Sequence, residues 1–281
     1  MNYRHAYHAG NFADVLKHAV LALVLQYMTG KPQPLRVIDL HAGLGGYDLE
    51  GAEAGKTGEW QGGIGRIFDA EVPAGAAPLL APYLNAVRAF NASNELRRYP
   101  GSPLLARALL RTSDTLIANE LHGEDFAILK GALKGAPNTK VLNLDAWVAL
   151  KALLPPPERR GLILIDPPFE APDEFARLAA GLEGALRRFA SGTYLVWYPI
   201  KDPREASRFL LEVRALGLKK LIGVSLAVCA RGLQPGLTET GLVVINPPYV
   251  LADQLAHLMP VLSTLMARGQ GAGFVVNDWS S

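Results

Sequence analysis

The chain has 281 residues, of which 49% are apolar and 19% charged, and its formal net charge is +2. This composition supports a sizeable core and argues against disorder, and so mild a charge is weak evidence for a dedicated nucleic-acid domain. The one cysteine, Cys229, excludes a disulfide framework within the chain and a cysteine-based metal site, and no metal is predicted.

The N-terminal stretch MNYRHAYHAG is rich in tyrosine, arginine and histidine and does not have the pattern of a signal peptide. The apolar run at 19–25 is too short to cross a bilayer, so we expect a cytoplasmic protein without membrane contact. Asn11 is a plausible N-cap and Asp14 suits the first turn of a helix that should run to about Met28 and close at Gly30. The histidines and tyrosines before it fit either a packed tail or a ligand site.

A glycine-rich loop follows the first predicted strand. Leu35 to Leu40 reads as a buried strand, and the sequence HAGLGG comes directly after it. Glycine permits a tight turn and lets a ligand approach the backbone closely. The dinucleotide fingerprint requires a third glycine where this chain has Asp48. The loop is therefore expected to bind a ligand through Gly43 and its neighbours, although a simple turn would contain the same residues.

Residues 51–111 interrupt the alternation of strands and helices, because no clear strand appears before about Thr115. Residues 81–91 have helical spacing, and a short helix capped at Ser102 with Pro103 at its first position is predicted. We interpret 51–111 as a helical insertion subdomain within a domain made of 1–50 and 112–281.

The rest of the chain alternates regularly between strands and helices. Such alternation predicts an α/β fold with a mostly parallel sheet and right-handed crossovers. The predicted strands end at Glu120, Asp145 and Asp166, or lie at 193–200, 219–228 and 240–250; the predicted helices lie at 124–133, 146–153, 173–189 and 204–216.

Acidic side chains close successive predicted strands, where open α/β sheets bind their ligands. A carboxylate such as Glu120 after the second strand can accept two hydrogen bonds from a ribose, and Asp145 after the third could meet an adenine edge. The chain has no phosphate-binding GxxxxGK[ST] motif. S-adenosylmethionine therefore fits these residues better than ATP or a nicotinamide dinucleotide.

The stretch GLILIDPPFE at 161–170 is the most informative in the chain. Asp166 and the backbone carbonyl of Pro167 can each accept one hydrogen from an adenine amine, and Phe169 offers a face on which an unstacked base can lie. A strand-ending turn would contain the same residues. The sequence INPPY repeats the pattern at Asn246, but an antiparallel last strand would place Asn246 at the opposite edge of the sheet. We therefore prefer Asp166 as the reactive group.

Several segments together resemble the RlmJ family: YRHAYHAGNFADVLKH, DLHAGLGGY, YPGSP, NELH and RRGLILIDPPFE. Members of that family transfer methyl from S-adenosylmethionine to N6 of one adenine in 23S ribosomal RNA. The resemblance covers nearly the whole chain and implies a Rossmann-like class I methyltransferase sheet with an antiparallel last strand. It also implies that residues 1–30 cover the cofactor and substrate.

The same resemblance implies roles for individual residues. Asp166 would receive the proton, Tyr3 would contact the RNA, and Arg4 is a candidate phosphate contact together with Arg97, Arg98 and Lys201. The residues expected around the cofactor are Lys17, His18, His41, Gly43, Ser102, Glu120, Asp145, Ala146 and Asp166.

Three positions depart from the family pattern without removing a required group. Phe169 stands where tyrosine is common, Ala146 where glycine is common, and GLGGY replaces the commoner GAGRY. The implied partner is 23S RNA that is protein-free or at an early stage of assembly, and a monomer without an obligate protein partner is expected. The alternatives are a DNA adenine-N6 methyltransferase, a non-catalytic RNA- or nucleotide-binding protein on the same scaffold and, third, a Rossmann oxidoreductase.

Overall fold

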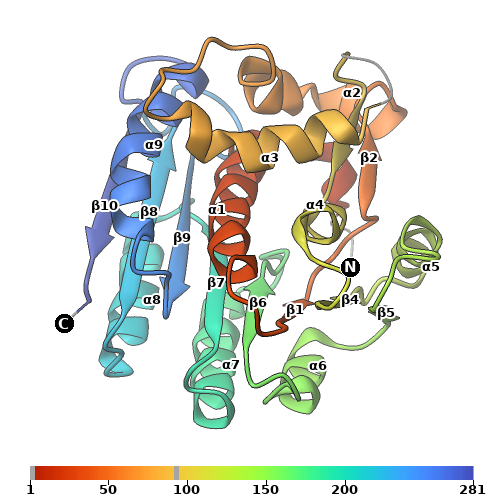
Figure 1. The fold of residues 1–281 in the computed structure, drawn as a ribbon. Helices are drawn as coiled ribbons and strands as arrows, with labels where there is room; N and C mark the ends of the chain where they lie inside the picture. The colour runs from red at the N-terminus through yellow and green to blue at the C-terminus, as the bar shows by residue number, and fades with distance from the viewer. Residues whose placement is uncertain (1–3, 92–94, 281) are drawn as a thin grey trace.

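The computed structural model describes residues 4–91 and 95–280, and an eight-stranded sheet forms its centre (Figure 1). The strand order is β10-β8-β9-β7-β6-β1-β4-β5. Six strands are parallel to one another: β1 (Arg36–Asp39), β4 (Thr115–Asn119), β5 (Thr139–Leu142), β6 (Gly161–Ile165), β7 (Thr193–Pro199) and β8 (Leu221–Ala227). The other two, β9 (Glu239–Ile245) and β10 (Gly273–Asp278), run against them.

The predicted α/β fold with a mostly parallel sheet is therefore confirmed, and β9 is antiparallel as expected. The sequence did not predict β10, which pairs with β8 at one edge of the sheet. Its side chains are mostly half-buried or exposed, so β10 lacks the apolar pattern that marked the central strands.

Helices cover both faces of the sheet (Figure 1). Successive strand residues point to opposite faces, so Val37 joins one apolar cluster and Ile38 the other. The first cluster is formed with α1 (Phe12–Thr29), α3 (Ala77–Ala89), α4 (Ser102–Leu109), α5 (Gly123–Ala132) and α9 (Leu251–Met266). The second is formed with α6 (Ala146–Leu153), α7 (Glu174–Arg188) and α8 (Pro203–Ala215).

The first helix, α1, passes through the interior and begins at the predicted cap. The side chain of Asn11 accepts hydrogen bonds from the backbone amides of Ala13 and Asp14, and Gly30 closes the helix. By length and composition α1 could cross a membrane, but most of its residues are buried inside this protein, as in the core helix of a globular domain.

The inserted segment, defined as residues 51–111, contains α2 (Ala52–Thr57), 3-10 turns at Glu59–Gly62 and Ile64–Arg66, then α3 and α4. A two-stranded sheet lies at its base, where β2 (Gly46–Asp48) pairs antiparallel with β3 (Arg98–Pro100). Each strand has three residues, which is too short for a periodic sequence signal, and neither was predicted.

The predicted cap of α4 is wrong, although the helix itself is present. Gly101 is the N-cap, and Ser102 is already the first helical residue. The Ser102 hydroxyl donates instead to Asp39 at the end of β1, at 2.6 Å. The Ser102 side chain therefore links α4 to β1, and among the described residues no side chain caps the start of α4.

Candidate active site

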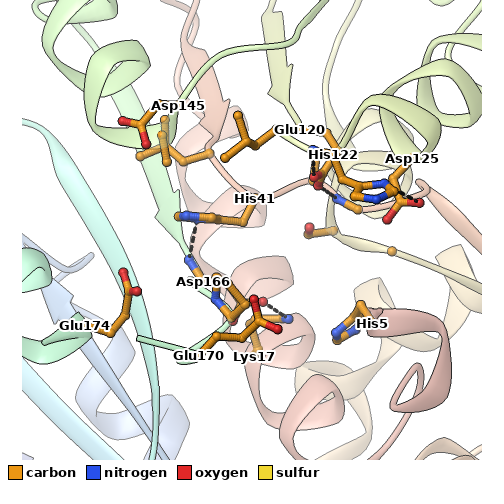
Figure 2. Close-up of a pocket in the computed structure, with 18 of the residues that line it drawn as sticks. His5, Lys17, His41, Glu120, His122, Asp125, Asp145, Asp166, Glu170 and Glu174 are labelled. Carbon is orange, nitrogen blue, oxygen red and sulfur yellow. Dashed lines mark hydrogen bonds and ion pairs between the residues drawn. The ribbon is translucent and has the colours of Figure 1, made fainter. Parts of the chain in front are cut away.

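A cavity opens at the carboxyl ends of β1, β4 and β6, and with its open mouth it encloses about 1130 Å³ (Figure 2). Its wall combines side chains from α1, the glycine-rich loop, the inserted segment and the starts of α6 and α7. The structure brings together every residue predicted around the cofactor: Lys17, His18, His41, Gly43, Ser102, Glu120, Asp145, Ala146 and Asp166.

Lys17 is a buried cation held between two carboxylates. Its Nζ lies 2.9 Å from Oδ1 of Asp14. It also donates to Oδ2 of Asp166 (Figure 2). Burial by itself would lower the pKa of Lys17, but Asp14 and Asp166 outweigh burial and raise it. The ammonium therefore stays charged and fixes the Asp166 carboxylate at the end of β6.

Asp14 connects Lys17 to the N-terminal turn. Its carboxylate lies 2.9 Å from Nε2 of His5 and accepts the Gly10 amide at 2.9 Å. Burial would raise the pKa of Asp14, but His5 and Lys17 hold it well below its usual range. Sequence reasoning placed neither His5 nor Asp14 in the site. The available signal was the i, i+3 spacing of Asp14 and Lys17, which puts both on one side of a helix.

Asp39 is a second buried acid, which lies behind the wall of the cavity next to Leu40 and His41, and it was also not predicted. It is 1% exposed, accepts the Ser102 hydroxyl and receives the backbone amide of His41 at 3.3 Å. Burial raises the pKa of Asp39 to about 7. Asp39 thus ties the end of β1 to the start of α4 and orients the hydroxyl of Ser102.

His41 packs against the backbone of the reactive stretch. Its Nδ1 accepts the amide of Asp166 at 3.2 Å (Figure 2), and burial lowers the pKa of His41 to about 4. The imidazole is therefore neutral and carries its proton on Nε2. This bond fixes the turn that begins at Asp166.

Glu120 braces the glycine-rich loop. One carboxylate oxygen accepts the amide of Gly43 at 2.9 Å and the other accepts the amide of His122 at 2.8 Å. Burial raises the pKa of Glu120. Gly43 has a φ of +59°, and a Cβ there would lie 2.3 Å from the hydroxyl of Tyr47, so both backbone and space require glycine.

The prediction that Asp145 ends a strand is wrong, because β5 stops at Leu142. It is the N-cap of α6, and its Oδ1 accepts the amides of Trp147 and Val148 at 3.0 and 3.1 Å. Its Oδ2 lies 4.0 Å from Arg177. One oxygen is therefore committed to the helix, and Asp145 still reaches the cavity wall from this position.

The residues after Asp166 divide between the cavity and the core. Pro168 lines the cavity, whereas Pro167 is buried beside it. The ring of Phe169 packs edge-on against Phe175 and Trp197, with centroids 4.8 and 5.8 Å away. Phe169 also has a φ of +48°, a backbone conformation that a bulky residue rarely adopts and that is often found at functional sites.

Asn246, the rival of Asp166, lies at the opposite edge of the sheet. Its amide donates to the carbonyls of Ala190 and Gly192, at 2.8 and 2.7 Å, in the turn before β7. Because β9 is antiparallel to β7, this position is at the amino end of the parallel strands. The amide therefore closes a turn remote from the cavity.

Of the residues predicted to contact RNA, the arginines lie in the part of the chain that the structure describes. Arg4 forms an exposed ion pair with Glu124, at 2.7 Å. Arg97 pairs with Glu95, and Arg98 lies over the ring of Phe90. Tyr3 lies outside the described residues.

The residues of the cavity suit a ligand with a charged amino-acid end and a nucleoside end. Lys17 and a buried His18 approach from α1, and Nε2 of His18 has no hydrogen-bond partner among residues 4–91 and 95–280. Glu120 and Asp145 supply acceptors on the side over β4 and β5, where Trp147 adds an aromatic face. S-adenosylmethionine fits this set. In the same described ranges, no three metal-binding side chains are placed to share a metal ion.

Comparison with known proteins extends over the whole chain. The family described as "Ribosomal RNA large subunit methyltransferase D, RlmJ" matches residues 32–280. The chain is 41% identical over 280 residues to ribosomal RNA large subunit methyltransferase J of Escherichia coli, covering 99% of this chain and 98% of that protein. The protein of the same name from Haemophilus influenzae is 40% identical, with the same coverage. A crystal structure from Legionella pneumophila is 33% identical with a TM-score of 0.88, covering 96% and 98% of the two chains.

Proposed function

Because the chain belongs to the RlmJ family of ribosomal RNA large-subunit methyltransferases, we propose that it methylates the N6 amine of one adenine in 23S ribosomal RNA, using S-adenosylmethionine. The observation that carries the proposal is the position of Asp166, which lies at the carboxyl end of β6 in the wall of a cavity suited to that cofactor.

The cofactor would be held by the side chains that converge on the cavity. Glu120 and Asp145 accept hydrogen bonds from the adenosine, and Gly43 lets the ligand approach the backbone. Lys17, His18 and Ser102 lie toward the amino-acid end. When bound, S-adenosylmethionine supplies a methyl group activated by its positive sulfonium.

Asp166 and Pro167 would prepare the adenine amine. The lone pair of this amine is delocalised into the ring, so the nitrogen is a poor nucleophile. The Asp166 carboxylate and the Pro167 carbonyl each accept one amine hydrogen, which draws the nitrogen toward tetrahedral geometry. Both acceptors are fixed before the base arrives, by Lys17, His41 and the proline ring, so little reorganisation is needed.

Asp166 would also receive the proton that the nitrogen loses on methylation. The ion pair with Lys17 would hold the Asp166 side chain in place for this step. Phe169 would provide the platform for the flipped base, worth about 1–3 kcal/mol per stacked base. Tyr3 and Arg4, in the N-terminal segment, would contact the RNA. We further propose that the enzyme works in the cytoplasm as a monomer on protein-free or early-assembly RNA.

The test is incubation with labelled S-adenosylmethionine and protein-free 23S RNA, followed by mapping of the modified base. Asp166→Ala should abolish transfer while changing cofactor affinity by less than about tenfold, or about 1.4 kcal/mol. Asn246→Ala is the matched control at the other proline pair and should retain activity. Labelling of duplex DNA but not RNA would favour a DNA methyltransferase. RNA binding with no labelling of either would favour the non-catalytic alternative.

A further inference from the structure

Three buried side chains form a hydrogen-bonded chain from the inserted segment to the cavity. Tyr83 lies in α3 and Tyr99 in β3, and both are 0% exposed. Their hydroxyl oxygens are 2.9 Å apart, and Oη of Tyr99 is 2.7 Å from Nδ1 of His18. The ring of Tyr99 also stacks on the imidazole, with centroids 5.5 Å apart. The chain therefore ends at a side chain that lines the cavity.

The direction of proton donation along this chain follows from burial. Within the described residues, Tyr99 is the one hydrogen-bond partner of the Tyr83 hydroxyl. If Tyr83 accepted from Tyr99, its own O–H would be buried without an acceptor, at a cost typical of an unsatisfied group. Tyr83 therefore donates to Tyr99, and Tyr99 donates to Nδ1 of His18.

A histidine that accepts at Nδ1 and is neutral carries its proton on Nε2. Burial lowers the pKa of His18 to about 3, so the ring is neutral at physiological pH. Its Nε2 is buried and has no hydrogen-bond partner in the described part of the chain. Because His18 lines the cavity, a bound ligand can supply the acceptor that this N–H lacks.

We propose that Tyr83 and Tyr99 are positioning residues that hold His18 as an Nε2–H donor for the carboxylate of the cofactor's methionyl group. This inference rests on the proposed function, because the acceptor it names belongs to S-adenosylmethionine. The tyrosines do not touch the ligand and act only through His18.

The carboxylate is the part of the cofactor that suits this position. His18 follows Lys17 in α1, so this wall of the cavity combines a fixed ammonium with an N–H donor. Glu120 and Asp145 line the other side, where the hydroxyls and amine of adenosine find acceptors. The methionyl ammonium has only donors and cannot satisfy Nε2–H.

The first experiment reads the tautomer of His18 in the ligand-free protein. The protein is labelled with ¹⁵N-histidine, and His18→Gln identifies the His18 signals. We expect a protonated Nε2 and an unprotonated Nδ1 in the parent. Tyr83→Phe should give a mixture of tautomers, because phenylalanine keeps the tilted ring contact with His18, with centroids 6.5 Å apart, and loses only the hydroxyl. Tyr194→Phe is the matched control, because its buried hydroxyl bonds to carbonyls of α7 and its end. A protonated Nδ1 in the parent, or no change in Tyr83→Phe, would overturn the role of the tyrosines.

The second experiment compares the affinities of two cofactor fragments by calorimetry. S-adenosylhomocysteine keeps the carboxylate, and methylthioadenosine lacks the amino-acid part. Tyr83→Phe should weaken binding of the first about fivefold, or about 1 kcal/mol, and leave the second unchanged. Equal weakening of both would overturn the carboxylate assignment. If the parent binds neither fragment, both the proposed function and the carboxylate assignment fail, and the NMR result still decides the role of the tyrosines.

Discussion

Replacing Asp39 by asparagine should make the protein less sensitive to alkaline pH. Asp39 is 1% exposed, and burial raises its pKa from 3.8 to about 7. The contribution of Asp39 to the free energy of unfolding is highest below pH 3.8, where Asp39 is protonated in both the folded and the unfolded protein. It falls as the pH rises through about 7, because the unfolded chain releases this proton at a lower pH than the folded protein does.

The size of this effect follows from the shift in pKa. At 1.36 kcal/mol per pKa unit, keeping Asp39 in the folded protein costs about 4 kcal/mol at pH 8 and about 2 kcal/mol at pH 5. Asparagine can still accept the Ser102 hydroxyl but does not titrate. The difference in free energy of unfolding between Asp39→Asn and the parent should therefore shift by about 2 kcal/mol in favour of the variant from pH 5 to pH 8.

Urea denaturation of both proteins at the two pH values measures this difference, and other titrating groups cancel because both proteins share them. Asp114→Asn is the control. Burial alone would raise the pKa of Asp114, but hydrogen bonds from Arg111 outweigh burial and hold this pKa below its usual range. Both test pH values therefore lie above the pKa of Asp114. Its effect on stability should be equal at pH 5 and 8. An equal effect for Asp39→Asn as well would refute the reasoning about the buried carboxyl group.

Three further changes have defined outcomes. Lys17→Met leaves the buried Asp14 carboxylate without its ammonium and should lower the free energy of unfolding by about 3–5 kcal/mol in urea denaturation; a loss under 1 kcal/mol would contradict the ion-pair account. Asn246→Ala removes two bonds that close the turn before β7 and should cost about 1–3 kcal/mol of stability, with the rate of methyl transfer per folded molecule unchanged. Gly43→Ala forces an unfavourable φ and places Cβ 2.3 Å from the hydroxyl of Tyr47, so calorimetry should show cofactor affinity reduced at least about tenfold; unchanged affinity would show that the loop relaxes freely.

The sequence predicted the elements whose patterns are local. The central strands are continuous apolar runs, and the acids that follow them meet at one edge because the strands are parallel. β2, β3 and β10 were missed because they are short or exposed. Asp145 was predicted at a strand end that lies three residues earlier, since its capping role depends on where α6 begins.

Contacts between distant residues could not be predicted from local patterns. Lys17 and Asp166 are 149 positions apart, and only the assembled sheet places the start of α1 beside the end of β6. Ser102 was expected to cap α4 because serine usually serves that purpose near a helix start. Its hydroxyl instead donates to Asp39, which is 63 positions away. The residue types of Lys17, Asp166 and Ser102 indicated that they form hydrogen bonds or ion pairs. Which residues they bond to depends on the tertiary packing.

The β2–β3 pair brings the two ends of the inserted segment together, and Tyr47 and Tyr99 face each other across it. Beyond this pair the segment packs back onto the main body. Its helices α3 and α4 join the apolar cluster formed with α1, and Arg66 donates to the carbonyl of Ala267 after α9. The segment is therefore a structural part of the domain, and a redesign that replaced it would have to cover the same face of α1 and return a hydroxyl to the place of Tyr83.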